Sequence, residues 1–128
     1  MERVKLKYKA AKDAHKTLEE IIKEPYSKII RDATIQRFEY TFEAVWKYLK
    51  EYLKEQHGIV CNSPKGCFRE AFSMGLLTDE QTEVFLKMTD DRNLTSHTYH
   101  EELAEAIYGR VKGYAELMAV LVERAHNN

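Results

Sequence analysis

Apolar side chains recur every three or four residues along most of this chain, and no stretch keeps the strict alternation of a half-buried β-strand. The clearest stripe lies in the longest pattern and consists of Ile30, Thr34, Phe38, Phe42, Val45, Leu49, Tyr52 and Leu53. A shorter stripe near the start consists of Leu6, Ala10, Ala14, Leu18 and Ile21. Such spacing puts the apolar positions on one face of an α-helix, so the pattern predicts an all-α protein.

Proline and glycine give the expected ends of the helices. The predicted helices cover about residues 4–23, 27–56 and 64–74, with a fourth from residue 79 and a last one from residue 99. Pro25 ends the first helix, Gly58 the second and Gly75 the short third one. Four substantial helices and one short helix predict an antiparallel four-helix bundle with one additional short helix.

Two segments have the sequence of a capping box, in which a hydroxyl residue is followed three positions later by Glu or Gln. Thr78 to Gln81 is expected to start the fourth helix, and Thr98 to Glu101 the last one. The second box would break the helical path of the chain just after His97, and it would make Tyr99 the first residue of the last helix.

Length and composition fit one soluble domain, which we expect to cover residues 1–128. Apolar residues make up 44% of the chain and charged residues 32%, which argues against disorder. The longest apolar run, Leu117 to Val122, is far too short to span a membrane. The first residues lack the apolar region of a signal peptide, so we expect a cytoplasmic protein with no membrane contact.

The two cysteines, Cys61 and Cys67, flank a turn with the sequence NSPKG. Two thiols do not complete a tetrahedral zinc site, and no histidine stands beside them at zinc-ligand spacing. We expect free thiols in a reducing compartment rather than a disulfide or a metal site. We expect no metal and no cofactor elsewhere in the chain.

Arg92 stands out because it continues the apolar face of the fourth helix, four residues after Met88. A guanidinium cannot lose its charge on burial, so it requires a carboxylate, a phosphate or a wet cleft. Glu39 and Glu43, one turn apart on the second helix, are candidate internal partners. Arg92 is therefore either a structural tie between helices or an anion-binding group.

His97 lies five residues after Arg92, which on an unbroken helix would set the two about 140° apart. A break at Thr98 lets them converge, and Asn93 could orient the imidazole if the helix extends that far. Tyr99 either packs against the last helix or offers an exposed hydroxyl at its N-terminus. The pair His97 and His100 also has an H-x-x-H spacing near two aspartates, which is a weak metal-site pattern.

Charge is unevenly distributed, although the net charge is only −1. Residues 1–31 hold nine Lys and Arg against five Asp and Glu, whereas residues 76–128 hold five against ten. Between Asp79 and Glu105 there are eight acidic side chains and two basic ones. Any RNA or phosphate binding must therefore come from a local arrangement, because the overall balance gives no nucleic-acid footprint.

Arg92 and His97 match the R-x4-H motif of the HEPN superfamily, and Asn93 matches the polar residue that often follows the arginine. Extended to Tyr99, the motif resembles the HepT branch, also labelled nucleotidyltransferase substrate-binding protein. Two further blocks, Ile35 to Leu53 and Ser63 to Leu77, are similar to that branch and occur in the expected order. The resemblance covers about residues 35–108. It departs from the branch at Val84-Phe85, where a tryptophan is expected.

The resemblance implies a HEPN-like helical homodimer in which the two Arg–His motifs face each other across a cleft. Many HEPN proteins are metal-independent endoribonucleases. In such a site His97 would assist attack of a ribose 2′-hydroxyl on the adjacent phosphate, Arg92 would stabilise the charge that develops, and Asn93 would be a supporting residue. RNA is then the implied substrate.

The HepT branch further implies a toxin–antitoxin pair. Its partner would be a minimal nucleotidyltransferase, the antitoxin, in a hetero-oligomer. That enzyme would transfer AMP onto Tyr99 and silence the toxin by filling the cleft with phosphates. An alternative is that the helical subunit is non-catalytic and helps a nucleotidyltransferase to bind its substrate.

Overall fold

The computed structural model describes residues 2–128, and its secondary structure is entirely helical in that range. The elements are α1 (Glu2–Ile22), α2 (Lys28–His57), α3 (Pro64–Ser73), α4 (Asp79–Leu94), the short 3₁₀ helix η1 (Thr95–His97) and α5 (Glu101–Asn127). The all-α prediction is confirmed. No helix among these residues has both the length and the apolar character needed to cross a lipid bilayer.

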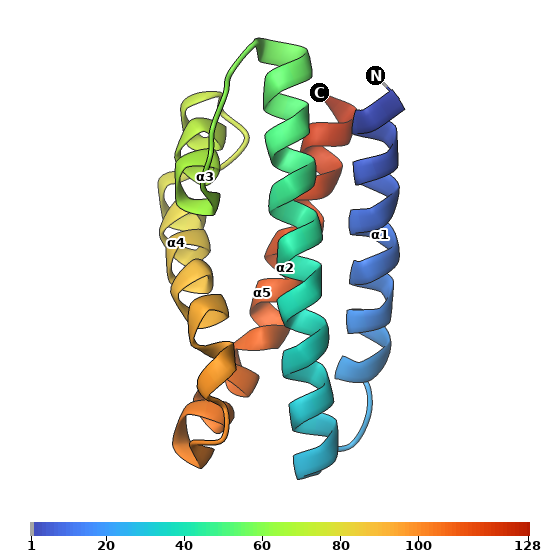
Figure 1. Cartoon of the computed structure of the whole chain (residues 1–128), viewed down its shortest axis with the longest axis vertical. Helices are drawn as coiled ribbons and strands as arrows, with labels where there is room; N and C mark the ends of the chain where they lie inside the picture. The colour runs from blue at the N-terminus through green and yellow to red at the C-terminus, as the bar shows by residue number, and fades with distance from the viewer. Residues whose placement is uncertain (1) are drawn as a thin grey trace.

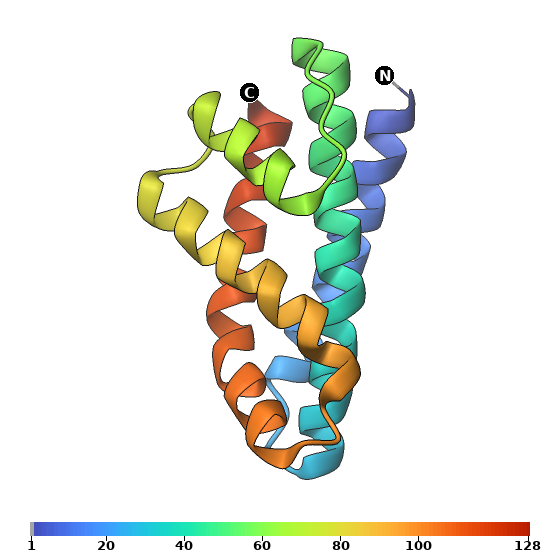
Figure 2. The same cartoon turned by 60° about the vertical axis from the view of Figure 1, so that its left-hand side comes forward.

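The long helices run alternately up and down, as the predicted bundle requires (Figure 1). α1, α2 and α5 lie side by side, while α3 and α4 cover one side, with α4 slanting across α2 and α5 (Figure 2). Both chain termini lie at one end of the bundle, and the connection between α4 and α5 lies at the other. The fold is thus an antiparallel four-helix bundle with the short α3 added.

The core is built around the predicted stripe of α2. Phe38 and Phe42 are completely or almost completely buried, at 0% and 1% exposure. The Phe42 ring lies 5.9 Å from that of Phe68 on α3, which in turn stacks 4.5 Å from Phe85 on α4. Phe38 stacks at 5.6 Å on Tyr114 of α5. These aromatic contacts join four helices through one continuous apolar interior.

The predicted apolar face of α1 is wrong in its first half. Leu6 is 66% exposed and Ala10 is exposed, while Val4 and Ala11 are buried together with Leu18. Each step of four residues rotates the position by about 40°, so three such steps back from Leu18 leave the buried face. Steps of seven residues drift by only about 20° and lead to Ala11 and Val4.

The helix ends follow local sequence signals. Thr78 forms the predicted capping box, since its hydroxyl accepts from the Gln81 amide at 3.1 Å and its amide donates to the Gln81 side chain at 3.0 Å. Gly58 and Gly75 follow α2 and α3 with φ of 65° and 79°, a left-handed conformation that favours glycine. The predicted ends of these helices are confirmed.

Cys61 and Cys67 form a disulfide, so the expectation of free thiols is wrong. The first turn of α3 brings the two Cα atoms to 5.3 Å, within the range that a disulfide spans. Cys67 is fully buried. The bond therefore closes the loop between α2 and α3 onto the core.

Reduction of this disulfide is expected to lower the free energy of unfolding by about 2 kcal/mol, because the short loop it closes regains chain entropy in the unfolded state. Urea unfolding with and without reductant measures the difference. The double variant Cys61→Ala/Cys67→Ala is the control and should not respond to reductant. Equal midpoints for reduced and oxidised wild type would contradict the prediction.

Candidate functional site at the joint between α4 and α5

The candidate residues gather at the joint between α4 and α5, residues 92–101, at the end of the bundle opposite the termini (Figures 1 and 2). The Thr95 hydroxyl lies 2.6 Å from Glu39 Oε2 and 2.8 Å from the Arg92 carbonyl oxygen, which anchors the start of η1 to α2. The Thr98 hydroxyl donates to the Thr95 carbonyl oxygen at 3.2 Å.

The predicted capping box at Thr98 is therefore wrong. Its hydroxyl bonds backwards to η1, and α5 begins at Glu101 after His100, whose side chain makes no cap bond. Tyr99 lies in the turn before α5 and is not its first residue. The α-helix does break between Arg92 and His97. The break lies at Leu94, where α4 ends and η1 begins, and not at Thr98.

Arg92 makes the two internal contacts that the sequence suggested. Its Nη1 lies 3.5 Å from Glu39 Oε2 and its Nη2 lies 3.3 Å from Glu43 Oε1. These distances exceed the 2.7–2.9 Å typical of a charge-assisted hydrogen bond. Arg92 Nε is buried and has no hydrogen-bond partner among residues 2–128. The guanidinium is thus held loosely between two carboxylates and retains unused donors.

Trp46 extends this contact series along α2. Its Nε1 donates a 2.9 Å hydrogen bond to Glu43 Oε2, the oxygen that does not face Arg92. The sequence analysis did not single out Trp46. The available signal was its position three residues after Glu43, which places the two on the same helical face.

His97 and Tyr99 lie next to each other on the surface of the joint. The His97 Nδ1 is 3.4 Å from the Tyr99 hydroxyl, and the Tyr99 side chain is 73% exposed. Asn93 is exposed in the last turn of α4, and no hydrogen bond joins it to His97 among residues 2–128. Within that range no hydrogen bond joins His97 to Arg92 either. One chain therefore brings these groups to the same joint without pairing them.

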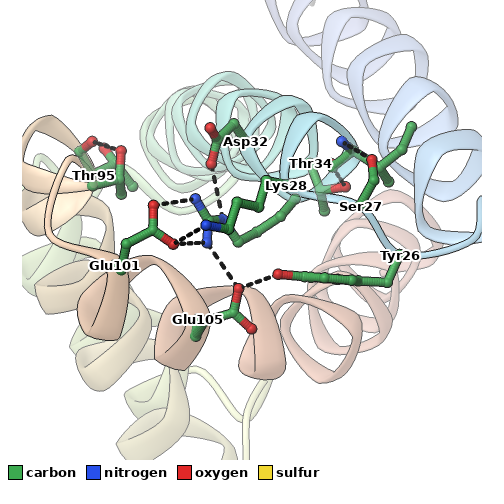
Figure 3. A network of polar contacts seen from close by, with 11 residues as sticks. Tyr26, Ser27, Lys28, Asp32, Thr34, Thr95, Glu101 and Glu105 are labelled. Carbon is green, nitrogen blue, oxygen red and sulfur yellow. Dashed lines mark hydrogen bonds and ion pairs between the residues drawn. The ribbon is translucent and has the colours of Figure 1, made fainter.

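A buried arginine that the sequence analysis missed holds the start of α5 (Figure 3). Arg31 is 2% exposed. Its Nη1 donates to Glu101 Oε2 at 2.7 Å and to Glu105 Oε2 at 2.8 Å. Its Nε donates to Asp32 Oδ1 at 2.9 Å. Hydrogen bonding to Arg31 lowers the pKa of Glu101, and bonds from Tyr26 and Arg31 lower that of Glu105. This cluster fixes the first turns of α5 against α2.

Asp91 holds α4 to α5 immediately before the joint. It is 2% exposed and receives bonds from Arg110 Nε at 2.7 Å, Arg110 Nη2 at 2.9 Å and the Tyr114 hydroxyl at 2.5 Å. Burial alone would raise the pKa of Asp91, but these hydrogen bonds outweigh it and lower the pKa. The aspartate is thus engaged in a helix contact. Residues 2–128 contain no group of three or more His, Cys, Asp or Glu placed to hold a metal ion.

Comparisons with known proteins agree with the fold and identify the family. The family model described as "Nucleotidyltransferase substrate binding protein like" matches residues 6–127. A curated relative, "Probable ribonuclease HepT" from Haemophilus influenzae, is 33% identical over 94 residues, which cover 70% of this chain and 63% of the relative.

Two solved structures share the fold. A protein from Thermus thermophilus has a TM-score of 0.87 and 51% identity, covering 90% of this chain and 98% of its own. A Haemophilus influenzae protein, described as having the fold of a substrate binding domain of a nucleotidyltransferase, has a TM-score of 0.81 and 25% identity, covering 93% and 98%. The resemblance to nucleotidyltransferase substrate-binding proteins seen in the sequence is confirmed: this chain belongs to the nucleotidyltransferase substrate-binding protein-like family.

Proposed function

We propose that this chain is the HepT-like toxin of a toxin–antitoxin pair and that it cleaves RNA in the cleft of a homodimer. The observation that carries the proposal is the joint itself. It combines an exposed imidazole, His97, with a guanidinium, Arg92, whose donors are incompletely used. An imidazole can take up and release a proton in general acid–base catalysis, and a guanidinium binds phosphate oxygens well.

In the proposed reaction His97 takes the proton of a ribose 2′-hydroxyl. The 2′-oxygen attacks the adjacent phosphorus, the bond from phosphorus to the 5′-oxygen breaks, and the products are a 2′,3′-cyclic phosphate and a 5′-hydroxyl. The departing 5′-oxygen takes a proton from His97 of the second copy. Arg92 stabilises the charge on the non-bridging oxygens, and this stabilisation is strongest as the phosphorane forms.

The proposed reaction uses two copies of the chain, because His97 of the second copy gives its proton to the departing oxygen. Light scattering of the purified protein should therefore give the mass of a dimer. A strict monomer at assay concentration that still cleaves RNA would contradict the two-copy cleft.

The proposed partner is a minimal nucleotidyltransferase that transfers AMP from ATP onto the Tyr99 hydroxyl with release of pyrophosphate. Tyr99 is accessible, and its oxygen lies 3.4 Å from His97 Nδ1. An AMP group there would bring a phosphate charge beside the imidazole and block the approach of RNA.

After co-expression with the transferase, intact mass measurement should show one or more AMP increments, and Tyr99→Phe should remove all of them. The matched control is Tyr26→Phe, which removes the hydroxyl of another exposed tyrosine, one that donates to Glu105 near the start of α5, and should keep the increments. Increments that persist in Tyr99→Phe would place the acceptor on another residue.

A second candidate is a non-catalytic subunit that helps a nucleotidyltransferase to bind its substrate. It is favoured by the two carboxylates beside Arg92 and by the eight acidic side chains between Asp79 and Glu105, which repel RNA and suit a basic partner surface. RNA cleavage by wild type and by His97→Ala separates the two candidates.

A further inference from the structure

The outer face of α2 continues beyond the two carboxylates that contact Arg92. Glu39, Glu43, Trp46 and Lys50 follow one another at spacings of four, three and four residues. Residues at these spacings lie on one face of a helix. The face therefore leads from Arg92 to an aromatic ring and then to a cation.

Two contacts define the position of the Trp46 ring. The hydrogen bond from Nε1 to Glu43 Oε2, at 2.9 Å, fixes one edge of the indole next to the group that holds Arg92. The Lys50 ammonium lies 5.8 Å from the ring centroid, at the distance of a cation–π contact. Trp46 is only partly buried, so part of the indole can be reached from solvent.

Lys47, Lys50 and Lys54 follow Trp46 within about two turns of α2 and alternate with Glu51 and Glu55, so this stretch carries one more lysine than glutamate. None of the three takes part in an ion pair among residues 2–128. The start of α5, in contrast, is acidic. A polyanion bound at Arg92 therefore has to pass Glu39 and Glu43, but beyond Trp46 it meets lysines without ion-pair partners in the described range, whereas the start of α5 presents acidic side chains.

We propose that Trp46 and Lys50 form a nucleotide subsite for single-stranded RNA, one step along the strand from the phosphate at Arg92. A base stacks on the indole, and the Lys50 ammonium pairs with the phosphate of the same nucleotide. Stacking needs a free base face, so the subsite selects single strands over duplexes. The subsite rests on the proposed function, because its place on the RNA strand is counted from the phosphate that Arg92 is proposed to bind.

Trp46 is the only tryptophan in the chain, so intrinsic fluorescence reports on this ring alone. We expect a ten-nucleotide single-stranded DNA, which carries no 2′-hydroxyl and cannot be cleaved, to quench the emission in a saturable manner at low salt. Polyphosphate of similar charge, which has no bases, should leave the emission unchanged. Equal quenching by polyphosphate, or no quenching by the oligonucleotide, would overturn the stacking site.

Variants are compared by the anisotropy of a labelled RNA of the same length, bound to protein that also carries His97→Ala to prevent cleavage. Trp46→Leu should weaken binding by about 5- to 150-fold, the range for loss of one stacked base. Trp46→Phe keeps a ring but loses the bond to Glu43, and it should recover most of the affinity. If Trp46→Phe binds as weakly as Trp46→Leu, the ring merely positions Glu43 and the subsite is wrong.

Lys50→Ala should weaken binding and reduce its dependence on salt, whereas Lys16→Ala, an exposed lysine of α1, should do neither. Cleavage assays separate the two proposals. In the nuclease, Trp46→Leu should raise KM more than it lowers kcat. If RNA binding depends on Trp46 but no RNA is cleaved, the subsite stands and the nuclease proposal fails. If Trp46→Leu cleaves RNA with an unchanged KM, only the subsite fails.

Discussion

His97→Ala is expected to lower RNA cleavage by about 10²- to 10⁴-fold, the usual contribution of a general acid–base group. The variant should unfold with nearly the wild-type free energy, within about 0.5 kcal/mol, because the His97 side chain is exposed. Cleavage of a labelled RNA by the purified protein, together with urea unfolding, measures both quantities.

His100→Ala is the matched control for this prediction. It removes another exposed imidazole from the same joint, whose ring lies 4.4 Å from that of Tyr99, and should leave cleavage within a few-fold of wild type. Equal residual cleavage by wild type and His97→Ala would remove the nuclease assignment and favour the non-catalytic subunit.

Asp91→Ala is expected to lower the free energy of unfolding by about 3 kcal/mol, because it leaves the Tyr114 hydroxyl and the Arg110 guanidinium without their acceptor. The neighbouring Asp90→Ala is the control. Asp90 is exposed and pairs only with the partly exposed Lys65, so its loss should cost about 0–1 kcal/mol. Urea unfolding at neutral pH compares them, and equal effects would contradict the role of Asp91.

The effect of Asp91 should also depend on pH. Its pKa is lower in the folded protein than in the unfolded chain, so its contribution is complete above the unfolded value, near pH 4, and is lost as the pH falls through the folded value. The stability difference between wild type and Asp91→Ala should therefore shrink as the pH falls below about 4. A difference that stays constant over this range would show that packing rather than charge is lost.

The helices could be predicted because their signals are local. The stripe of α2, the capping box at Thr78 and the glycines that end α2 and α3 each act within a few residues. The capping box at Thr98 failed although its sequence is as good, because the hydroxyl had an alternative acceptor in the Thr95 carbonyl oxygen. Local patterns decide a structure only where no competing partner lies within reach.

The sequence indicated the contacts of Arg92 with Glu39 and Glu43 but not the other contacts around the joint. Arg92, His97 and Tyr99 could be found from one short motif. Arg31 meets Glu101 across 70 residues of sequence, and the spacing of the chain gives no sign of it. The disulfide in place of the expected free thiols could not be predicted either, because its formation depends on how the first turn of α3 directs Cys67 toward Cys61.

The joint lies between two strong attachments. Asp91 fastens the last turns of α4 to α5, and Arg31 fastens the first turns of α5 to α2. The residues between them contribute little to the core, so most substitutions there leave the bundle folded. Substitutions of the exposed residues of this segment can therefore change its chemistry at little cost in stability. A well-folded relative with a changed joint is the expected product, and its stability alone gives no evidence about its chemistry.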